Sequence, residues 1–180
     1  ISSYKDLPKI IYQFQNKLRN EIRAKSGVMR CREFIMKDMY SFTRDDQEHK
    51  EFYDKTIQAY HKIFERLGIG DKTYLTFASG GAFAEFSHEF QTITDAGEDV
   101  IYLHEDKKLA INQEVLNDKV LEQLGLNREE LKELKAAEVG NIFSFGTSKS
   151  EVLNLRFIDE KDQEQFVVLG SYGIGPGRVM

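Results

Sequence analysis

The sequence predicts an α+β domain built on an antiparallel β-sheet that is flanked by helices. Residues 10–21 and 29–42 alternate polar and apolar side chains, which is typical of half-buried β-strands. Residues 45–67 instead repeat their apolar side chains every three or four positions, as an amphipathic helix does. Strand-like segments return after this helix. The order of hairpin, helix and further strands therefore favours an α+β fold.

The first two predicted strands form an antiparallel hairpin. In the first strand Tyr12, Phe14 and Leu18 share the face that we expect to be half-buried. The opposite face is polar, and it could be exposed or could line a site; its members are Gln13, Gln15, Lys17, Arg19 and Glu21. A short polar turn at residues 25–27 leads to the second strand. Alternate residues of that strand again share a face: Arg30, Arg32, Phe34, Met36, Asp38 and Tyr40.

The helix at residues 45–67 has recognisable ends. Asp45 followed by Glu48 predicts an N-terminal capping box, and Gly68 predicts the C-terminal stop. Its apolar stripe is interpreted as core that packs against the sheet. His49 and His61 fall at polar positions, so we expect both at the surface.

The remainder of the chain mixes strands with short helices. Strands are expected at residues 73–78, 84–94, 100–103, 141–158 and 165–169. Gly80 and Gly81 predict a turn between the first two of these. Residues 111–124 are expected to form a helix, and Asn127 caps a second, short one. A glycine-rich segment at residues 170–178 follows the last strand.

Composition bounds the class of protein. The chain has 180 residues, a net charge of −5 and one cysteine, Cys31, which fits one soluble domain in a reducing, cytoplasmic compartment. No apolar run approaches the roughly 20 residues of a membrane span, so we expect no membrane association. The first residue is Ile1 and the last residues lie in a glycine-rich segment, so we expect a piece of a longer protein.

Charge is unevenly distributed along the chain. Residues 1–44 contain ten basic and four acidic side chains, a net charge of +6, so the remainder carries −11. A basic segment on an acidic protein indicates a local anion site more than a general nucleic-acid surface. A solvated charged face is the alternative.

Three segments carry candidate chemistry. Arg19 and Glu21 can hold a phosphate and an exocyclic amine of one ligand, or can form a cross-strand ion pair. Arg30 and Phe34 can offer a phosphate fork and a stacking plane for a base, or can be a core Phe beside a surface Arg. The glycines of residues 173–178 allow close backbone approach to a ligand, and Arg178 at their end adds a further guanidinium. Taken alone, this glycine-rich turn is weak evidence for a ligand site.

Together these segments resemble motifs two and three of the class II aminoacyl-tRNA synthetases. The second motif is an Arg-x-Glu strand joined by a loop to an Arg-x-x-x-Phe strand, and the third is Gly-x-Gly-x-x-Arg. Longer stretches are similar to the bacterial prolyl-tRNA synthetase family: residues 3–8, 27–30, 32–42, 87–90, 138–143, 146–147 and 172–175. The resemblance covers essentially all of residues 1–180, as a partial catalytic domain.

The resemblance implies an ATP-dependent proline–tRNA ligase. Proline would attack the α-phosphorus of ATP to give prolyl-adenylate, and the prolyl group would pass to the 3′ end of tRNA(Pro). ATP and Mg²⁺ are the implied cofactors, and a homodimer is implied for the full-length enzyme. No protein nucleophile is required, because positioning and charge neutralisation carry such a reaction.

The resemblance also implies roles for individual residues. The implied ATP-binding residues are Arg19, Glu21, Arg30, Phe34, Thr147 and Arg178, with Arg19 and Arg178 catalytic. Arg19 would bridge the α-phosphate and the proline carboxylate, and Glu21 would hold the adenine amine. Arg30 and Arg178 would contact the outer phosphates, and Phe34 with Arg178 would enclose the adenine. Thr147 would lie beside the ribose.

Proline and Mg²⁺ have implied residues as well. The implied proline-binding residues are Arg19, His88, Glu89, Phe90 and Ser171. Glu138 and Asp38 are the acids that would approach Mg²⁺. Two positions depart from the family: Ser148 and Lys149 follow Thr147 where an aromatic is expected nearby, and Ser144 stands where Gln or Lys is commoner.

Several family parts are missing from the chain. Only residues 104–137 occupy the place of the editing insertion, a short linker that is too small for another domain. The first motif and the loop that holds the proline amine would precede Ile1, and an anticodon-binding domain would follow Met180. We therefore expect the isolated chain to be a poor enzyme or inactive.

Two other functions remain open. One is another class II synthetase, of the threonine, serine, glycine or histidine groups. The other is a non-catalytic synthetase-like protein that binds a ligand or tRNA, although Arg19, Arg30 and Arg178 are all retained. A plain RNA-binding module is disfavoured by the acidic remainder of the chain.

Overall fold

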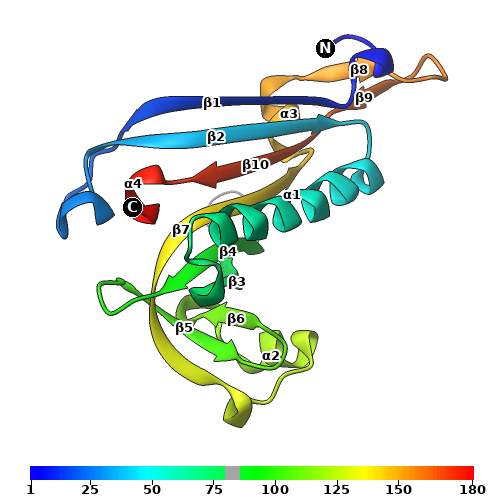
Figure 1. The fold of residues 1–180 in the computed structure, drawn as a ribbon. Helices are drawn as coiled ribbons and strands as arrows, with labels where there is room; N and C mark the ends of the chain where they lie inside the picture. Colours follow the sequence, from blue (N-terminus) through cyan, green and yellow to red (C-terminus); the bar gives the residue numbers. More distant parts are fainter. Residues whose placement is uncertain (80–85) are drawn as a thin grey trace.

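A central sheet of eight strands organises the chain. The computed structural model describes residues 1–79 and 86–180, so the turn predicted at Gly80 and Gly81 lies outside the described residues. The strands are β1 (Lys9–Leu18), β2 (Glu33–Thr43), β3 (Thr73–Ser79), β4 (Phe86–Ile93), β5 (Asp99–His104), β6 (Leu109–Asn112), β7 (Lys132–Gly146) and β10 (Val168–Ile174). Their spatial order is β1-β2-β10-β7-β4-β3-β6-β5 (Figure 1). All pairings are antiparallel except β3–β6, so the predicted α+β fold on an antiparallel sheet is confirmed.

The predicted hairpin is confirmed, with β1 paired to β2 from Lys9↔Phe42 to Leu18↔Glu33. The first strand ends before Arg19, which with residues 20–32 forms the connecting loop. Ser26 and Gly27 have left-handed backbone conformations (φ 56° and 58°) and begin the short 3-10 turn Gly27–Met29.

The prediction for the apolar face of β1 is wrong. Tyr12, Phe14 and Leu18 are 70%, 66% and 79% exposed, whereas Asp38 on the polar face is buried. The reason is the position of β1 at the edge of the sheet, because α1 packs along the inner strands β2 and β10 instead (Figure 1).

The long helix α1 (Asp46–Arg66) confirms the second prediction. The Asp45 side chain accepts from the Glu48 amide at 2.8 Å, and Gly68 ends the helix at φ 77°. The capping box is half formed, because the Glu48 carboxylate turns to Arg44 instead of the Asp45 amide. His61 is exposed as predicted, but His49 is buried: the first turn of α1 lies beside Gly170 of β10.

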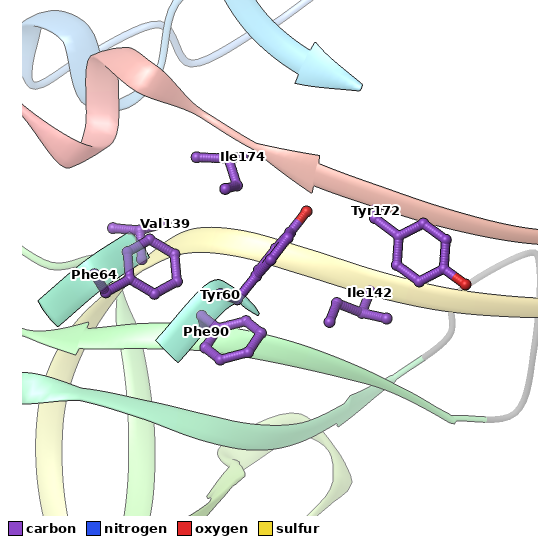
Figure 2. Packing of buried hydrophobic residues seen from close by; sticks show 7 residues of the cluster. All are labelled: Tyr60, Phe64, Phe90, Val139, Ile142, Tyr172 and Ile174. Carbon is purple, nitrogen blue, oxygen red and sulfur yellow. The ribbon is translucent and has the colours of Figure 1, made fainter. Parts of the chain in front are cut away.

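The main core lies between α1 and one face of the sheet. Figure 2 shows Tyr60 and Phe64 of the helix against Phe90, Val139, Ile142, Tyr172 and Ile174 of the strands. Burial of such side chains contributes roughly 1.5–3 kcal/mol each. The opposite face of these strands is left for the site described below.

Residues 109–124 correct another prediction. The expected helix at 111–124 is shortened to α2 (Asp118–Leu124), because Leu109–Asn112 forms β6 and pairs with β3 and β5. Since β5 also pairs with β7, the strands β7, β4, β3, β6 and β5 close into a ring. The short segment capped by Asn127 is a single 3-10 turn, Arg128–Glu130. Residues 104–137 are thus folded into the same sheet.

Two short helices and a small hairpin complete the chain. Residues 141–158 contain α3 (Ser148–Leu153) in addition to the predicted strands, because Ser148–Leu153 turns away where β7 ends. The strands β8 (Arg156–Ile158) and β9 (Glu164–Phe166) form a separate pair, and α4 (Pro176–Val179) follows β10. Among the described residues, none of the helices has both the length and the apolarity needed to cross a membrane.

Candidate active site

A pocket of about 480 Å³ lies on the face of the sheet opposite α1. Its walls come from β1, β2, β4, β7, β10, the loop between β1 and β2, and the start of α4. This volume is within the range of small-molecule sites. The pocket brings together nine of the predicted site residues: Arg19, Glu21, Arg30, Phe34, Asp38, Glu89, Glu138, Ser171 and Arg178.

Arg19 and Phe34 form the wall nearest the hairpin. Arg19 follows the end of β1 and its amide donates to the carbonyl of Arg32 at 2.9 Å, which continues the hairpin past the strand. Its guanidinium carbon lies 5.3 Å from the centroid of the Phe34 ring, in cation–π contact. Within the described part of the chain, Arg19 forms no ion pair with a carboxylate, so its charge is available to a ligand.

Glu21 and Arg30 face each other across the loop. Arg30 Nη1 donates to Glu21 Oε2 at 3.1 Å, and Arg30 Nε donates to Glu98 Oε2 at 2.6 Å. The Arg23 amide and the Arg30 guanidinium both donate to Glu21 and lower the pKa of its carboxyl. Glu21 is therefore an ionised acceptor at the mouth of the pocket.

Arg178 lines the pocket beside the loop between β1 and β2. The backbone of Gly175 starts α4, and Pro176 occupies the first turn, where a missing amide costs nothing. This turn directs Arg178 back over the sheet, where Nε donates to the Met29 carbonyl at 2.9 Å. Nη1 donates to the carbonyl of Glu138 at 3.0 Å and to its Oε2 at 3.1 Å.

Two carboxyls at the floor of the pocket have raised pKa values. Burial, and then the nearby Glu138, raise the pKa of Glu89 to about 7. Burial also raises the pKa of Glu138, although Arg178 opposes this. Gln91 Nε2 and Asn112 Nδ2 donate to Glu89 Oε2 at 2.9 and 3.2 Å. This end of the pocket carries closely spaced acids that a cation would stabilise.

Asp38 is engaged within the protein. Lys17 forms an ion pair with its Oδ2, and Gln15 Nε2 donates to the same oxygen at 2.9 Å. The residue is 6% exposed. A buried carboxylate with these partners fixes Lys17 on the pocket wall.

The structure does not bring three predicted residues to the pocket. Phe90 is fully buried in the core beneath α1, and His88 points to the same side, where Nδ1 lies 2.8 Å from Tyr53 Oη. Successive side chains of a β-strand point to opposite faces of the sheet, so Glu89 faces the pocket while its neighbours His88 and Phe90 face α1. Thr147 precedes α3 outside the pocket lining, and its hydroxyl donates to Glu151 at 2.5 Å.

Several pocket residues were not predicted. Lys17, Met36 and Tyr40 line the pocket, and their shared strand parity with Arg19 and Phe34 was a usable signal. Asn141 also lines it, opposite Glu89 in the β4–β7 pairing. Glu98 holds Arg30 from 68 residues away, and no local pattern could have revealed it.

The fold and this site define a class of protein. The whole chain, residues 1–180, matches the tRNA synthetase class II core domain of the G, H, P, S and T group, so the chain belongs to that family. The solved prolyl-tRNA synthetase of Cryptosporidium parvum complexed with L-proline and AMP has the same fold. It superposes with a TM-score of 0.69 at 17% identity, over 99% of this chain and 30% of that chain.

The similar curated proteins within the family are proline–tRNA ligases. That of Ehrlichia ruminantium is 34% identical over 193 residues, which cover 100% of this chain and 45% of that protein. That of Rhizobium etli is 37% identical over 207 residues, which cover 100% and 46%. This chain therefore spans less than half the length of these relatives.

Proposed function

We propose that the chain is the nucleotide- and proline-binding part of the catalytic domain of a proline–tRNA ligase. In the first step a proline carboxylate oxygen attacks the α-phosphorus of ATP, and pyrophosphate leaves. In the second step the prolyl group moves to the 3′ end of tRNA(Pro) and AMP leaves. The similarity of the whole chain to proline–tRNA ligases supports this substrate choice.

One observation carries the proposal: Arg19 lies against Phe34 inside the pocket without a carboxylate partner among the described residues. The cations Lys17, Arg30 and Arg178 are each paired with an acid. Arg19 is thus the guanidinium best suited to neutralise an α-phosphate and a proline carboxylate at once.

ATP would occupy the wall formed by the hairpin and α4. The Phe34 ring offers the adenine a stacking surface, and the ionised Glu21 accepts from its exocyclic amine. Arg30 and Arg178 line the same part of the pocket beside Met29 and would bind the outer phosphates. In both side chains the contacts with described residues engage Nε and Nη1, so Nη2 can donate to a phosphate oxygen while the carboxylate contacts hold the guanidinium in place.

The site of proline is assigned to the floor of the pocket. Ser171 of β10 and Glu89 of β4 line the same pocket as Arg19, whereas His88 and Phe90 lie on the α1 side of β4. Glu89 with a pKa near 7 can hold or release a proton near the substrate amine. We therefore propose Arg19, Ser171 and Glu89 as the proline-contacting residues.

Mg²⁺ fits one of the two expected acids. Glu138 lies close enough to Glu89 to raise the pKa of its carboxyl, and a cation at this end of the pocket would favour the ionised form of both acids. Asp38 does not fit, because Lys17 and Gln15 already satisfy its buried carboxylate. The described residues contain no cluster of three His, Cys, Asp or Glu side chains that could hold a metal ion alone. Mg²⁺ would enter with ATP and neutralise phosphate charge near Glu138.

The remaining parts of the proposal follow from the family. The full-length protein would be a homodimer, as the resemblance to the family implies. It would act in the cytoplasm, where proline, ATP and tRNA meet. Residues 104–137 contribute β6 and the first part of β7 to the sheet, and α2 packs against it, so we propose that this chain holds no separate editing domain.

The test is amino-acid-dependent exchange of pyrophosphate into ATP, measured on the full-length protein. Proline should drive exchange, and threonine, serine, glycine and histidine should not. Exchange driven by one of those four instead of proline would reject the specificity. Failure with every amino acid, together with measurable ATP binding, would favour the non-catalytic ligand-binding protein.

A further inference from the structure

The loop between β1 and β2, residues 19–32, has few contacts that could fix Arg30. Ile22 and Val28 are 85% and 59% exposed, so little apolar burial holds it. Within the loop, the Lys25 amide donates to the Arg30 carbonyl at 3.1 Å. Within the loop Glu21 accepts from Arg30 Nη1 at 3.1 Å, and a contact from outside the loop is needed to fix the guanidinium at Nε as well.

Glu98 supplies such a contact. Its Oε2 accepts from Arg30 Nε at 2.6 Å, and its Oε1 lies 3.4 Å from Lys25 Nζ, so one carboxylate holds two cations of the loop. The Glu98 side chain is 18% exposed and that of Arg30 is 36% exposed, which limits solvent screening. Among the contacts of the described residues, Glu98 engages Nε and Glu21 engages Nη1, which leaves Nη2 to a phosphate oxygen.

The backbone beneath Glu98 is fixed on β7. A Cβ atom on Gly97 would lie 2.1 Å from the carbonyl oxygen of Ala136, so only glycine permits this close approach. The Gly97 amide donates to the Thr94 carbonyl at 3.0 Å, and Asp99 then pairs with Ala136. Glu98 therefore projects from a turn with little freedom.

Both arginines that we expect to bind phosphate are held by acidic residues anchored on the same strand, β7. Arg178 is held by Glu138 of β7, and Arg30 is held by Glu98, whose turn is fixed at Ala136 of β7. The positions of two guanidinium groups from distant parts of the sequence are thereby fixed relative to the same strand. Such preorganisation reduces the free energy spent on ordering side chains when a ligand binds.

We propose that Glu98 is a positioning residue for ATP: it orients Arg30 through Nε and holds the loop of residues 19–32 against the sheet. The proposal rests on the proposed function in that the ligand of Arg30 is the nucleotide phosphate. Glu98 itself touches no substrate. Its removal should weaken ATP binding and leave the chemical step nearly unchanged.

The first measurement is hydrogen exchange on the full-length protein without nucleotide. In Glu98→Ala, amides of residues 19–32 should exchange roughly tenfold faster, as expected for loss of a charge-assisted hydrogen bond. Helix α1 should exchange as in the wild type. The matched control is Glu105→Gln, which removes an exposed pair with Lys132 at the far end of β5. Unchanged exchange of residues 19–32 in Glu98→Ala would overturn the proposal.

The second measurement separates KM from kcat in proline-dependent pyrophosphate exchange by the full-length protein. Glu98→Ala should raise the KM for ATP about tenfold with kcat within about twofold. Glu98→Gln, which keeps an acceptor oxygen without the charge, should give an intermediate KM. A fall in kcat at unchanged KM would overturn the positioning role. If the wild type shows no exchange with any amino acid, the proposed function fails, while the hydrogen-exchange result still decides whether Glu98 fixes the loop.

Discussion

The guanidinium of Arg19 lies over the ring of Phe34, 5.3 Å from its centroid, although the two residues belong to opposite arms of the hairpin. Arg19 stands two residues beyond Lys17, the register partner of Phe34. The contact keeps a cation without an acidic partner in the pocket and covers one face of an aromatic ring. We expect an adenine that stacks on that face to turn the guanidinium toward the phosphates.

Replacement of Phe34 should weaken ATP binding selectively. Phe34→Leu keeps an apolar side chain but removes the stacking plane, which contributes about 1–3 kcal/mol per base. The KM for ATP in pyrophosphate exchange should rise by roughly tenfold or more, with the KM for proline little changed. Phe34→Tyr is the control and should retain ATP affinity. An unchanged KM for ATP in Phe34→Leu would remove Phe34 from the adenine site.

Removal of the Arg178 side chain should abolish adenylate formation. Arg178→Ala loses a guanidinium aimed at the phosphates, and loss of one such electrostatic group costs about 10²–10³ in rate. It also frees Glu138 from its pairing, which adds repulsion toward phosphate. Thermal unfolding should show an intact fold, and Arg156→Ala, a surface pair with Glu164, provides the matched control. Near-normal exchange by Arg178→Ala would exclude Arg178 from the site.

His49 should make the fold less stable in acid. Burial lowers the pKa of its imidazole below the ordinary value of 6.5, and neither ring nitrogen has a hydrogen-bond partner among the described residues. A base with a lowered folded-state pKa contributes stability above its unfolded-state pKa, and this stability is lost as the pH falls below about 6.5. Denaturant unfolding of His49→Phe at pH 7.5 and 5.5 should show a smaller pH dependence than the wild type.

The control for this experiment is His61→Gln. The pKa of His61 is also lowered by burial, but the residue is exposed overall, so this substitution should change the pH dependence less than His49→Phe. Equal pH dependence in wild type and His49→Phe would show that His49 protonates freely in the folded protein.

Glu89 should make the folded protein less stable at high pH, the opposite of the effect of His49. Its folded-state pKa of about 7 exceeds the ordinary 4.5, so its stabilising contribution is present below pH 4.5 and is lost as the pH rises through 7. Glu89→Gln mimics the protonated acid and should raise the free energy of unfolding by about 2 kcal/mol at pH 8, with little effect at pH 5. Chemical denaturation at both values measures this, with Glu105→Gln as the exposed control. Destabilisation by Glu89→Gln at pH 8 would refute the raised pKa.

The local pattern of the sequence determined the hairpin, the long helix and much of the pocket. Alternation in residues 10–42 places Arg19, Phe34 and Asp38 on one face, and the helical spacing with Asp45 and Gly68 at its ends defines α1. These features depend on neighbours two to four residues apart, so they can be read without the fold.

Tertiary structure decided which surfaces these elements cover. Parity shows which residues of the hairpin share a face, but not that β1 lies at the sheet edge with Tyr12 exposed while Asp38 of the inner strand β2 is buried. The apolar spacing near Ile111 predicted a helix, but this segment pairs with β3 as strand β6. His49 falls at a polar position of the helix, but its contact with β10 buries it. Glu98 reaches Arg30 through a turn fixed on β7, 68 residues along the chain. Such contacts arise from long-range packing and strand order, which local periodicity does not contain.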